Sequence, residues 1–541
     1  MVPCLLDVSL LRSIPLTSLQ TILVVLVLAV LTTVVAAVLL PRTVPAATGA
    51  SSADRPTRFT RPALRTVLRA VGRYTARIVM VGVPVLLVIA LGGLLINRPM
   101  HYVRTVGDLA KAAAPRAQVS SRIESPPKSS TFGAAPASAW KASFHDVGDG
   151  SQEATWTGPV SGIKLPVRVV LPAGYRPNDG RTYNVLVGLH GWVGDPQSLV
   201  TGLASSKRLQ EAIDAGRIPP SILVFPSLNA DGASQPDCVN INGRPAVGTW
   251  IAQEIPRMIQ ATFPNVTTQR AGWMIMGISA GAYCAARTAY DVPQRFGSVG
   301  VMSSYDLPGE GSLAHSGREL QAQNGLSSML GKRKPDGMRF YVLGAQDDPY
   351  STARTAWSMD EAVRKPDSVT VDTPAKGGHS WTLWNNHFPS LLAWWGSDPA
   401  VFAAAGLPAP QGDARAKATA AGVKPLSETS KDQRAARPAS PVRAKPFEVN
   451  GLGTMIVAVV VSLGALGVVL FWSPRWGRRR DGGKRSVARL GGAILGRVVV
   501  ILVAAGLVAV TVGIGANAGG GFYTSWNDLR ASVRTSGNSG K

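Results

Sequence analysis

WMIMGISAGAYCAARTAY, residues 273–290, is the stretch that decides the expected fold. Its first four residues predict a buried strand and residues 280–290 predict a helix, so Gly277-Ile278-Ser279-Ala280-Gly281 falls at a strand-to-helix junction. A serine hydroxyl is a weak nucleophile at neutral pH, and it needs a sharp turn, a neighbouring base and donors for an oxyanion. The two glycines leave room for such a turn, and the start of the helix adds partial positive charge. We therefore predict that Ser279 is a nucleophile.

An acid and then a histidine are expected further along such a chain. The apolar run at residues 339–343 is followed by the acidic turn Gly344-Ala345-Gln346-Asp347-Asp348-Pro349, and a glycine-rich loop at residues 376–381 carries His379. Of the six histidines, only His379 and His387 follow this turn. We expect His379 to be the base, because its glycines let the loop carry an imidazole to the sheet edge. His387 is expected to be structural.

The residues alone leave two choices for the acid. One of Asp347 and Asp348 would accept the Nδ1 proton of the histidine, and the other would cap the turn beside Pro349.

An oxyanion hole normally combines the amide after the nucleophile with an amide from an earlier strand-to-helix loop. The amide of Ala280 has the first position. For the second, the apolar run at residues 185–189 leads into His190-Gly191-Trp192-Val193-Gly194, and we predict the amide of Trp192, with that of Gly191 as the alternative. His190 is expected to shape this loop by local hydrogen bonds.

Short apolar runs alternate with longer amphipathic ones across residues 140–400. This order predicts an α/β architecture, a mostly parallel sheet with helices on both faces. The expected strands are Leu165–Leu171, Tyr183–Leu189, Ile222–Phe225, Trp273–Met276, Ser298–Met302 and Arg339–Leu343. The expected helices are Ser198–Ala215, Gly248–Thr262, Ala280–Tyr290 and Ser351–Arg364.

At these motifs the chain resembles the putative-esterase branch of the α/β hydrolases, which includes feruloyl esterases, S-formylglutathione hydrolases and mycolyltransferases. The resemblance covers about residues 150–397 and rests on Leu189-His190-Gly191, Gly277 to Gly281, Gly344 to Asp347 and Gly377-Gly378-His379. It implies the α/β-hydrolase fold and action on carboxylic esters or thioesters without a metal or cofactor. Family members tend to place the acid three residues after the strand-end glycine, which selects Asp347.

Two of the three cysteines lie in this region, Cys238 and Cys284. An address outside the cytoplasm and the similarity to secreted actinobacterial-type esterases favour a disulfide between them, and two buried thiols are the alternative. The spacing of the cysteines along the chain is not typical of a metal site.

Four apolar stretches without a charged side chain are each long enough to cross a bilayer. They are Leu19–Leu40, Ile78–Ile96, Gly451–Trp472 and Val498–Ala516. A cleaved signal peptide is the alternative for the first, but its apolar run is longer than is usual for one. A transporter is disfavoured, because the spans contain no intramembrane charge beyond Arg497 at an edge, whereas translocation paths usually carry polar groups at depth.

The net charge of +24 lies outside the central region. Residues 140–400 carry 22 basic and 22 acidic side chains, so nucleic-acid binding is not expected. The excess lies in residues 1–139, with 15 basic and 4 acidic side chains, and in residues 401–541, with 19 basic and 6 acidic ones. Basic residues cluster beside the apolar spans in 41–77 and 473–497, which predicts that these loops are cytoplasmic. The central domain and both termini would then be extracytoplasmic, in a multi-pass protein of the plasma membrane.

The predicted organisation places the hydrolase domain between two membrane hairpins. An offset of 420 residues aligns the two second spans, with Arg77 matching Arg497 and Asn97 matching Asn517, which suggests a duplicated hairpin. The segments are a hairpin at 1–110, a linker at 111–139, the hydrolase at 140–400, a linker at 401–448 and a second hairpin at 449–541.

The sequence thus predicts a membrane-anchored, extracytoplasmic serine esterase whose substrate is an ester of a cell-envelope lipid or glycan. The expected partners are the lipid bilayer and that substrate. An acyltransferase with the same triad is the enzymatic alternative, and a catalytically idle envelope-binding or assembly module is the alternative of another class.

Overall fold

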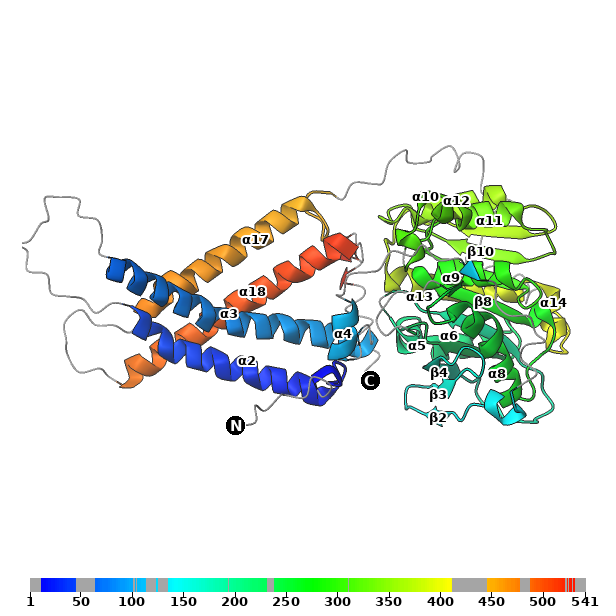
Figure 1. Ribbon diagram of the computed structural model, residues 1–541, viewed down its shortest axis with the longest axis horizontal. Helices are drawn as coiled ribbons and strands as arrows, with labels where there is room; N and C mark the ends of the chain where they lie inside the picture. Colours follow the sequence, from blue (N-terminus) through cyan, green and yellow to red (C-terminus); the bar gives the residue numbers. More distant parts are fainter. Residues whose placement is uncertain are drawn as a thin grey trace, which may run out of the picture. The chain divides into compact units, whose positions relative to one another are not determined.

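A computed structural model of the protein divides into two compact units. One comprises residues 99–443 with the terminal segments 1–14 and 521–541, and the other comprises residues 15–98 and 444–520. Figure 1 shows the mixed sheet and helices of the first and the long helices of the second. The structure describes residues 11–44, 64–100, 103, 105–112, 123–124, 135–192, 194–230, 238–309, 311–410, 445–476, 487–520, 523, 525–527 and 529–530.

A nine-stranded sheet in the order β11-β10-β9-β8-β5-β6-β4-β3-β2 forms the centre of the first unit. β6, β5, β8, β9, β10 and β11 run parallel, and β4, β3 and β2 continue the sheet in antiparallel pairs. The strands are β2 (His145–Asp146), β3 (Gln152–Thr157), β4 (Lys164–Val170), β5 (Asn184–Leu189), β6 (Ser221–Pro226), β8 (Trp273–Ile278), β9 (Ser298–Met302), β10 (Arg339–Leu343) and β11 (Ser368–Asp372).

The mostly parallel sheet and all six expected strands are confirmed. The sequence reading missed β2, β3 and β11, which lie toward the two edges of the sheet. β3 and β11 are only partly buried and contain polar residues, so they lack the continuous apolar run of a central parallel strand.

Helices cover both faces of the sheet (Figure 1). They are α5 (Pro196–Gly202), α6 (Ser205–Asp214), α7 (Val247–Thr249), α8 (Ile255–Thr262), α9 (Ala280–Asp291), α10 (Arg318–Gln323), α11 (Leu326–Lys332), α12 (Thr352–Ala362), α13 (Trp381–Gly396) and α14 (Pro399–Ala404). A short helix, α4 (Val106–Ala112), precedes the domain.

Two of the expected helices are interrupted. The prediction over Ser198–Ala215 is wrong at its centre, where Ala204 has a left-handed backbone with φ of 48° that separates α5 from α6. Within the expected helix Gly248–Thr262, residues Trp250–Glu254 form a π-helical turn. The other two helices were predicted to within two residues of their ends, whereas α13 was not predicted.

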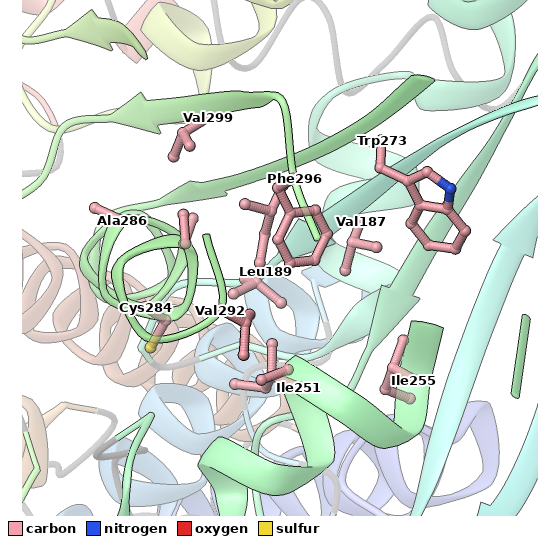
Figure 2. Close-up of a cluster of buried hydrophobic side chains, with 14 of the residues drawn as sticks. Val187, Leu189, Ile251, Ile255, Trp273, Cys284, Ala286, Val292, Phe296 and Val299 are labelled. Carbon is pink, nitrogen blue, oxygen red and sulfur yellow. The ribbon is translucent and has the colours of Figure 1, made fainter. Parts of the chain in front are cut away.

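Alternate residues of the central strands enter two different apolar cores. Val187 and Leu189 of β5 pack with α8 and α9 on one face, as Figure 2 shows together with Cys284 and Phe296. Leu186 of the same strand packs on the other face with α5, α6 and α13. Burial on both faces explains why these strands consist almost entirely of apolar residues.

The two predicted linkers are shorter than expected. Within residues 111–139, Ile123–Glu124 forms β1, which pairs with β7 (Asn240–Ile241), and Ala137–Trp140 forms a 3-10 turn. The indole of Trp140 is buried against Trp156, which explains why a segment rich in Ala, Pro and Ser is folded there.

The second linker prediction, over 401–448, is wrong at its start. Helix α14 continues to Ala404, its residues Val401 and Phe402 are buried, and the side-chain amide of Asn184 donates to the carbonyl of Val401 at 2.8 Å. Residues 411–444 of this linker lie outside the described part of the chain.

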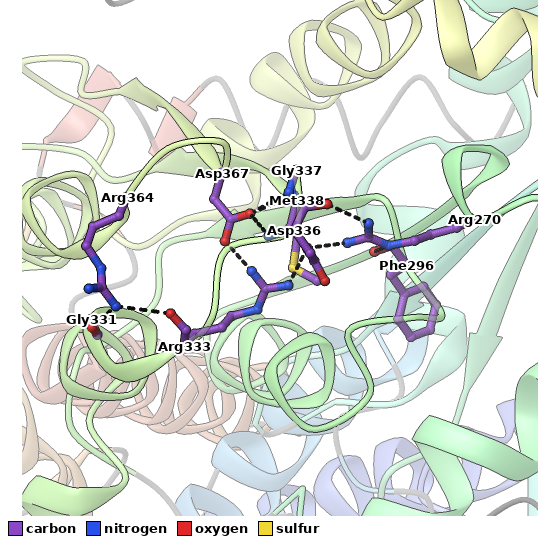
Figure 3. Close-up of polar contacts among 9 residues, drawn as sticks. All are labelled: Arg270, Phe296, Gly331, Arg333, Asp336, Gly337, Met338, Arg364 and Asp367. Atoms are coloured by element: carbon purple, nitrogen blue, oxygen red, sulfur yellow. Dashed lines mark hydrogen bonds and ion pairs between the residues drawn. The ribbon is translucent and has the colours of Figure 1, made fainter.

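A polar network closes the edge of the sheet where β10 and β11 begin (Figure 3). Asp367 is buried, pairs with the buried guanidinium of Arg333, and accepts hydrogen bonds from three successive amides at residues 336–338 at 2.8–2.9 Å. Arg270 extends the network to Asp336 and the carbonyl of Phe296. These bonds fix the turn that leads into β10.

Replacing Asp367 with Ala is expected to destabilise the domain by about 3–5 kcal/mol. Buried Arg333 would lose its buried partner and keep only the more exposed Asp336, and the amides at 336–338 would lose their acceptor. Asp336→Ala is the matched control. It removes a more exposed carboxylate that pairs with Arg270 and Arg333, and it leaves Arg333 paired with buried Asp367, so it should cost only about 1 kcal/mol. Denaturant unfolding would measure both, and equal losses would contradict this account of Asp367.

Among its described residues, the second unit contains four helices long and apolar enough to cross a membrane. The candidate spans are Leu19–Thr43, Leu68–Arg98, Leu452–Arg475 and Val487–Ala518. They correspond to α2 (Leu19–Leu39), α3 (Leu64–Met100), α17 (Leu452–Gly467) with the π-helical turn Val468–Trp472, and α18 (Val487–Gly520).

Part of each expected basic loop is helical. α3 begins at Leu64 and α18 at Val487, so both helices begin more than ten residues before the apolar runs predicted at Ile78 and Val498. Arginine is a good helix former, and the apolar period alone does not mark such an extension. Residues 45–63 and 477–486 of these loops lie outside the described part of the chain.

Candidate active site

Ser279 lies on a sharp turn between β8 and α9, near the middle of the sheet. Its backbone has φ of 53° and ψ of −121°, an unfavourable conformation for a residue with a side chain. Its N–H donates to the carbonyl of Met302 at 2.9 Å, which ties the turn to β9. The turn leaves the serine partly exposed, while the residues around it are buried.

The two glycines of the motif are required by close backbone contacts. A Cβ at Gly277 would lie 2.0 Å from the carbonyl oxygen of Gly281, and a Cβ at Gly281 would lie 2.1 Å from the carbonyl oxygen of Leu189. No side chain fits at such distances. The predicted reason for the glycines is therefore correct, and the second contact also sets how closely α9 approaches β5.

The loops that follow three parallel strands bring Ser279, His379 and Asp348 together. His379 Nε2 lies 2.8 Å from Ser279 Oγ, and His379 Nδ1 lies 2.9 Å from Asp348 Oδ2. The histidine and the aspartate are buried, whereas the serine is not. Neutral His379 with its proton on Nδ1 would donate to Asp348 and leave Nε2 free to accept the serine proton.

The choice of Asp347 as the partner of His379 is wrong. Asp348 occupies that position and also accepts from the hydroxyl of Thr352 at 2.8 Å and the amide of Tyr350 at 2.9 Å. Asp347 instead accepts from the amide of Gly378 at 2.7 Å and so holds the loop that carries the histidine.

The sequence contained a weak signal for Asp348. The count of three residues from Gly344 cannot reveal which of two adjacent carboxylates a turn directs inward. A threonine four residues after Asp348, at the start of the following helix, is within hydrogen-bonding reach of that aspartate and not of its neighbour.

The loop predicted to supply an oxyanion donor lies directly beside the serine. A Cβ on Gly191 would come within 3.2 Å of Ser279 Cβ, so this loop and the nucleophile turn are in close contact. Trp192 is partly exposed in the loop, and Ala280 is buried at the start of α9. The assignment of the amides of Ala280 and Trp192, or Gly191, to an oxyanion stays a prediction.

His190 is fully buried, and both of its ring nitrogens have local partners. Nδ1 lies 2.9 Å from the carbonyl oxygen of Gly191, and Nε2 accepts the amide N–H of Leu228 at 3.0 Å. This requires the neutral tautomer with the proton on Nδ1. Asn229 donates to the carbonyl of Gly194 at 2.8 Å and holds the other end of the loop. The expected shaping role of His190 is confirmed by these contacts.

His387 lies on α13, with Nδ1 2.6 Å from Asp372 Oδ2. The phenol of Tyr341 donates to the same carboxylate oxygen at 2.5 Å. The hydrogen bonds of His387, Tyr341 and Asp372 tie α13 to the middle of β10 and the end of β11. The structural role expected for His387 agrees with this position.

Aromatic rings surround the imidazole of His379. Tyr350 is 4.8 Å from it and Trp384 5.1 Å, measured between ring centroids, and Trp381 is edge-on to Trp384. Sequence reasoning missed these residues, because Trp381 and Trp384 are ordinary in a helix that packs on a sheet and no motif marks Tyr350 in the turn before α12.

Cys238 and Cys284 are joined by a disulfide with a Cα–Cα distance of 5.2 Å. Cys284 lies one turn into the helix that follows Ser279, so the bond ties the nucleophile helix to the segment that leads into β7. Within the described residues, no group of three or more His, Cys, Asp or Glu side chains could hold a metal ion.

The central part of the chain matches a known protein family. Residues 159–395 match the family model described as Putative esterase, which confirms the predicted resemblance over this segment. The match covers less than half of the chain and leaves the four apolar helices outside it. No curated protein matches the sequence.

Solved structures with low sequence identity to the chain also match it. An S-formylglutathione hydrolase from Agrobacterium tumefaciens is 15% identical, with 47% of this chain and 97% of that chain covered and a TM-score of 0.37. A fluorophosphonate-binding serine hydrolase from Staphylococcus aureus is 13% identical, with 47% and 98% covered and a TM-score of 0.37. A ferulic acid esterase from Anaeromyces mucronatus is 17% identical, with 45% and 89% covered and a TM-score of 0.34.

Proposed function

We propose that this chain, whose residues 159–395 match the putative-esterase family, is a membrane-anchored serine esterase that works outside the cytoplasm. The observation that carries the proposal is the continuous line of hydrogen-bonding atoms from Ser279 Oγ through His379 to Asp348. A buried carboxylate, an imidazole and a partly exposed hydroxyl in this order are the groups that acyl transfer requires.

In the first step, Ser279 Oγ attacks the carbonyl carbon of an ester while its proton moves to His379 Nε2. Asp348 stabilises the imidazolium that forms, and the amides of Ala280 and Trp192 donate to the developing oxyanion. The tetrahedral intermediate collapses when the bond to the alcohol oxygen breaks. That oxygen takes the proton from Nε2, which leaves an acyl group on Ser279.

In the second step, water reverses the sequence. His379 Nε2 removes a proton from the water as its oxygen attacks the acyl carbon, and the same proton returns to Ser279 Oγ as the acid leaves. An envelope alcohol in place of water would transfer the acyl group instead, without any change in the protein groups.

The four long apolar helices support the membrane part of the proposal. The basic residues at 41–77 and 473–497 favour a cytoplasmic side for those loops, and a disulfide is typical of a domain on the oxidising side. A tether of this kind holds a domain without net charge next to the envelope. We therefore propose envelope lipid or glycan esters as the substrates.

The chemistry can be tested on the intact, detergent-purified protein. We expect it to hydrolyse a short-chain nitrophenyl ester and to react with a fluorophosphonate, and peptide mass spectrometry should place the adduct on Ser279. Release of free acid from a labelled acyl donor, rather than a new ester, would distinguish hydrolysis from transfer. A protein that neither turns over esters nor takes up the probe would contradict the proposal.

The proposed topology predicts that a maleimide reaches two engineered cysteines differently in cells that express the protein without Cys4. A membrane-impermeant maleimide should label Ser427→Cys in the 401–448 segment of intact cells. It should label Ser486→Cys only after the cells are opened, because the basic loop is expected to face the cytoplasm. Equal labelling of both positions in intact cells would overturn the proposed orientation.

A further inference from the structure

Trp384 of α13 contacts both His379 and Ser303, the residue that follows β9. Its indole N–H donates to Ser303 Oγ at 2.9 Å, and both residues are buried. Ser303 follows β9 with φ of 59°, and its amide donates to the carbonyl of Leu343 in β10 at 2.7 Å. The acceptor for the indole is therefore fixed by the backbone of two central strands.

The ring of Trp384 also contacts the imidazole of His379, with an interplanar angle of 89°. The two hydrogen bonds of the imidazole, to Asp348 and to Ser279, lie at its two nitrogens. A ring held only at these atoms can still tilt about the line that joins them. Contacts with neighbouring rings restrict such a tilt, and a tilt changes the direction of the Nε2 lone pair.

We propose that Trp384, held by Ser303, is a positioning residue that keeps the imidazole of His379 directed at Ser279 Oγ. This inference rests on the proposed function. It assigns Trp384 no contact with the reacting atoms, so the effect of losing its hydrogen bond should fall on kcat and leave substrate binding nearly unchanged.

Trp384→Phe and Ser303→Ala each remove the hydrogen bond and keep most of the packing. We expect each to lower kcat about 10- to 100-fold, with KM within about twofold of the wild-type value, since small misplacements of a base are costly. The double variant should be little worse than either single variant, because both remove the same restraint.

Trp394→Phe is a matched control from the same helix. Trp394 is equally buried and its indole donates to Thr370 Oγ1 at 3.0 Å, but the neighbouring ring, 5.6 Å away between centroids, is that of Tyr341 and not that of His379. Trp394→Phe should lose about as much thermal stability as Trp384→Phe but keep the wild-type kcat. Equal kcat in Trp384→Phe and Trp394→Phe would overturn the inference, whereas an inactive wild-type protein would overturn the proposed function instead.

An independent observation concerns the four apolar helices. Arg77 of α3 is buried, and its guanidinium donates to the hydroxyl of Thr43 at 2.7 Å and the carbonyl of Thr43 at 3.2 Å. It also donates through Nη1 to the carbonyl of Leu470, at the end of the third span, at 3.2 Å. Arg77 thus binds the ends of the first and the third span, which are the first helices of the two hairpins.

Arg497 of α18 makes the reciprocal contacts. It donates through Nη1 to the carbonyl of Ala37 in the first span at 3.1 Å, through Nε to the carbonyl of Ser473 at 3.1 Å, and through Nη2 to the carbonyl of Trp476. Arg77 and Arg497 are equivalent positions at the offset of 420 residues that aligns the second helices of the two hairpins. The first helices align at an offset of 433 residues, which superimposes Pro41 on Pro474. At that offset Ala37 is equivalent to Leu470, and Thr43 to Trp476.

We infer that the two hairpins are related copies that pack about an approximate two-fold axis, with each hairpin supplying an arginine that binds the other. The last carbonyls of a helix have no partner within it, and lipid offers none. A guanidinium carries several fixed donors and a charge that favours the negative end of a helix, so it is suited to both helix ends at once.

The inference can be tested with the full-length protein, which is allowed to fold and is then cleaved. A protease site inserted among residues 411–444 separates the C-terminal hairpin from the rest of the detergent-purified protein, and a C-terminal tag retrieves it. The wild-type fragments should stay together. The variant Arg77→Gln/Arg497→Gln should lose most of its N-terminal fragment, and the two single variants should be weakened to a similar degree.

Arg73→Gln/Arg489→Gln is the control, because both of these arginines are exposed on the same helices. Its fragments should remain associated, and nitrophenyl ester hydrolysis should be unchanged in all variants that were folded before cleavage. Fragments of the Arg77/Arg497 variant that stay together as in the wild-type protein would overturn the inference, as would wild-type fragments that separate.

Discussion

Ser279→Ala is expected to reduce kcat toward a nitrophenyl ester by about 10⁶-fold and to abolish fluorophosphonate labelling, because no other hydroxyl lies at the imidazole Nε2 in the described structure. A residual acceleration of about 10³-fold over water would come from the oxyanion donors and substrate binding. The measurement is a progress curve at high enzyme concentration, together with labelling of the same sample.

The variant should remain folded. Alanine removes one partly exposed hydroxyl and leaves the backbone of the turn unchanged, so its thermal unfolding should match that of the wild-type protein. Undiminished labelling of folded Ser279→Ala would show that a different residue is the nucleophile.

Asp348→Asn is expected to lower kcat by about 10⁴-fold near neutral pH. An asparagine amide can donate to His379 Nδ1, which favours the tautomer with the proton on Nε2, and that nitrogen then cannot accept the proton of Ser279. The substitution keeps the shape of the side chain and one acceptor, so the amide of Tyr350 or the hydroxyl of Thr352 retains a partner.

Asp347→Asn is the matched comparison, since the two carboxylates are adjacent. Asp347 binds the amide of Gly378 and not the imidazole, and an asparagine oxygen can still accept that bond, so the loss should stay below about tenfold. The kcat values of the two variants, with their thermal unfolding, decide the assignment. A larger loss in Asp347→Asn would restore the acid that sequence comparison selected.

Much of the site was predictable because local sequence specifies it. Ser279 required only a strand, a turn with two glycines and a helix, and the glycine contacts confirm why those residue types occur there. His379 followed from chain order and a glycine-rich loop. The aromatic residues around it were missed, since Trp384 is indistinguishable by sequence from any apolar residue of a buried helix.

The sequence by itself determined the buried strands, the nucleophile turn and the four apolar helices, because each depends on residues that are close along the chain. Only the tertiary structure decided between Asp347 and Asp348, and it placed Trp384 against His379 and paired Arg77 with the end of the third span. These contacts join residues from separate elements. They depend on how turns direct neighbouring side chains and on how helices pack, which no local pattern specifies.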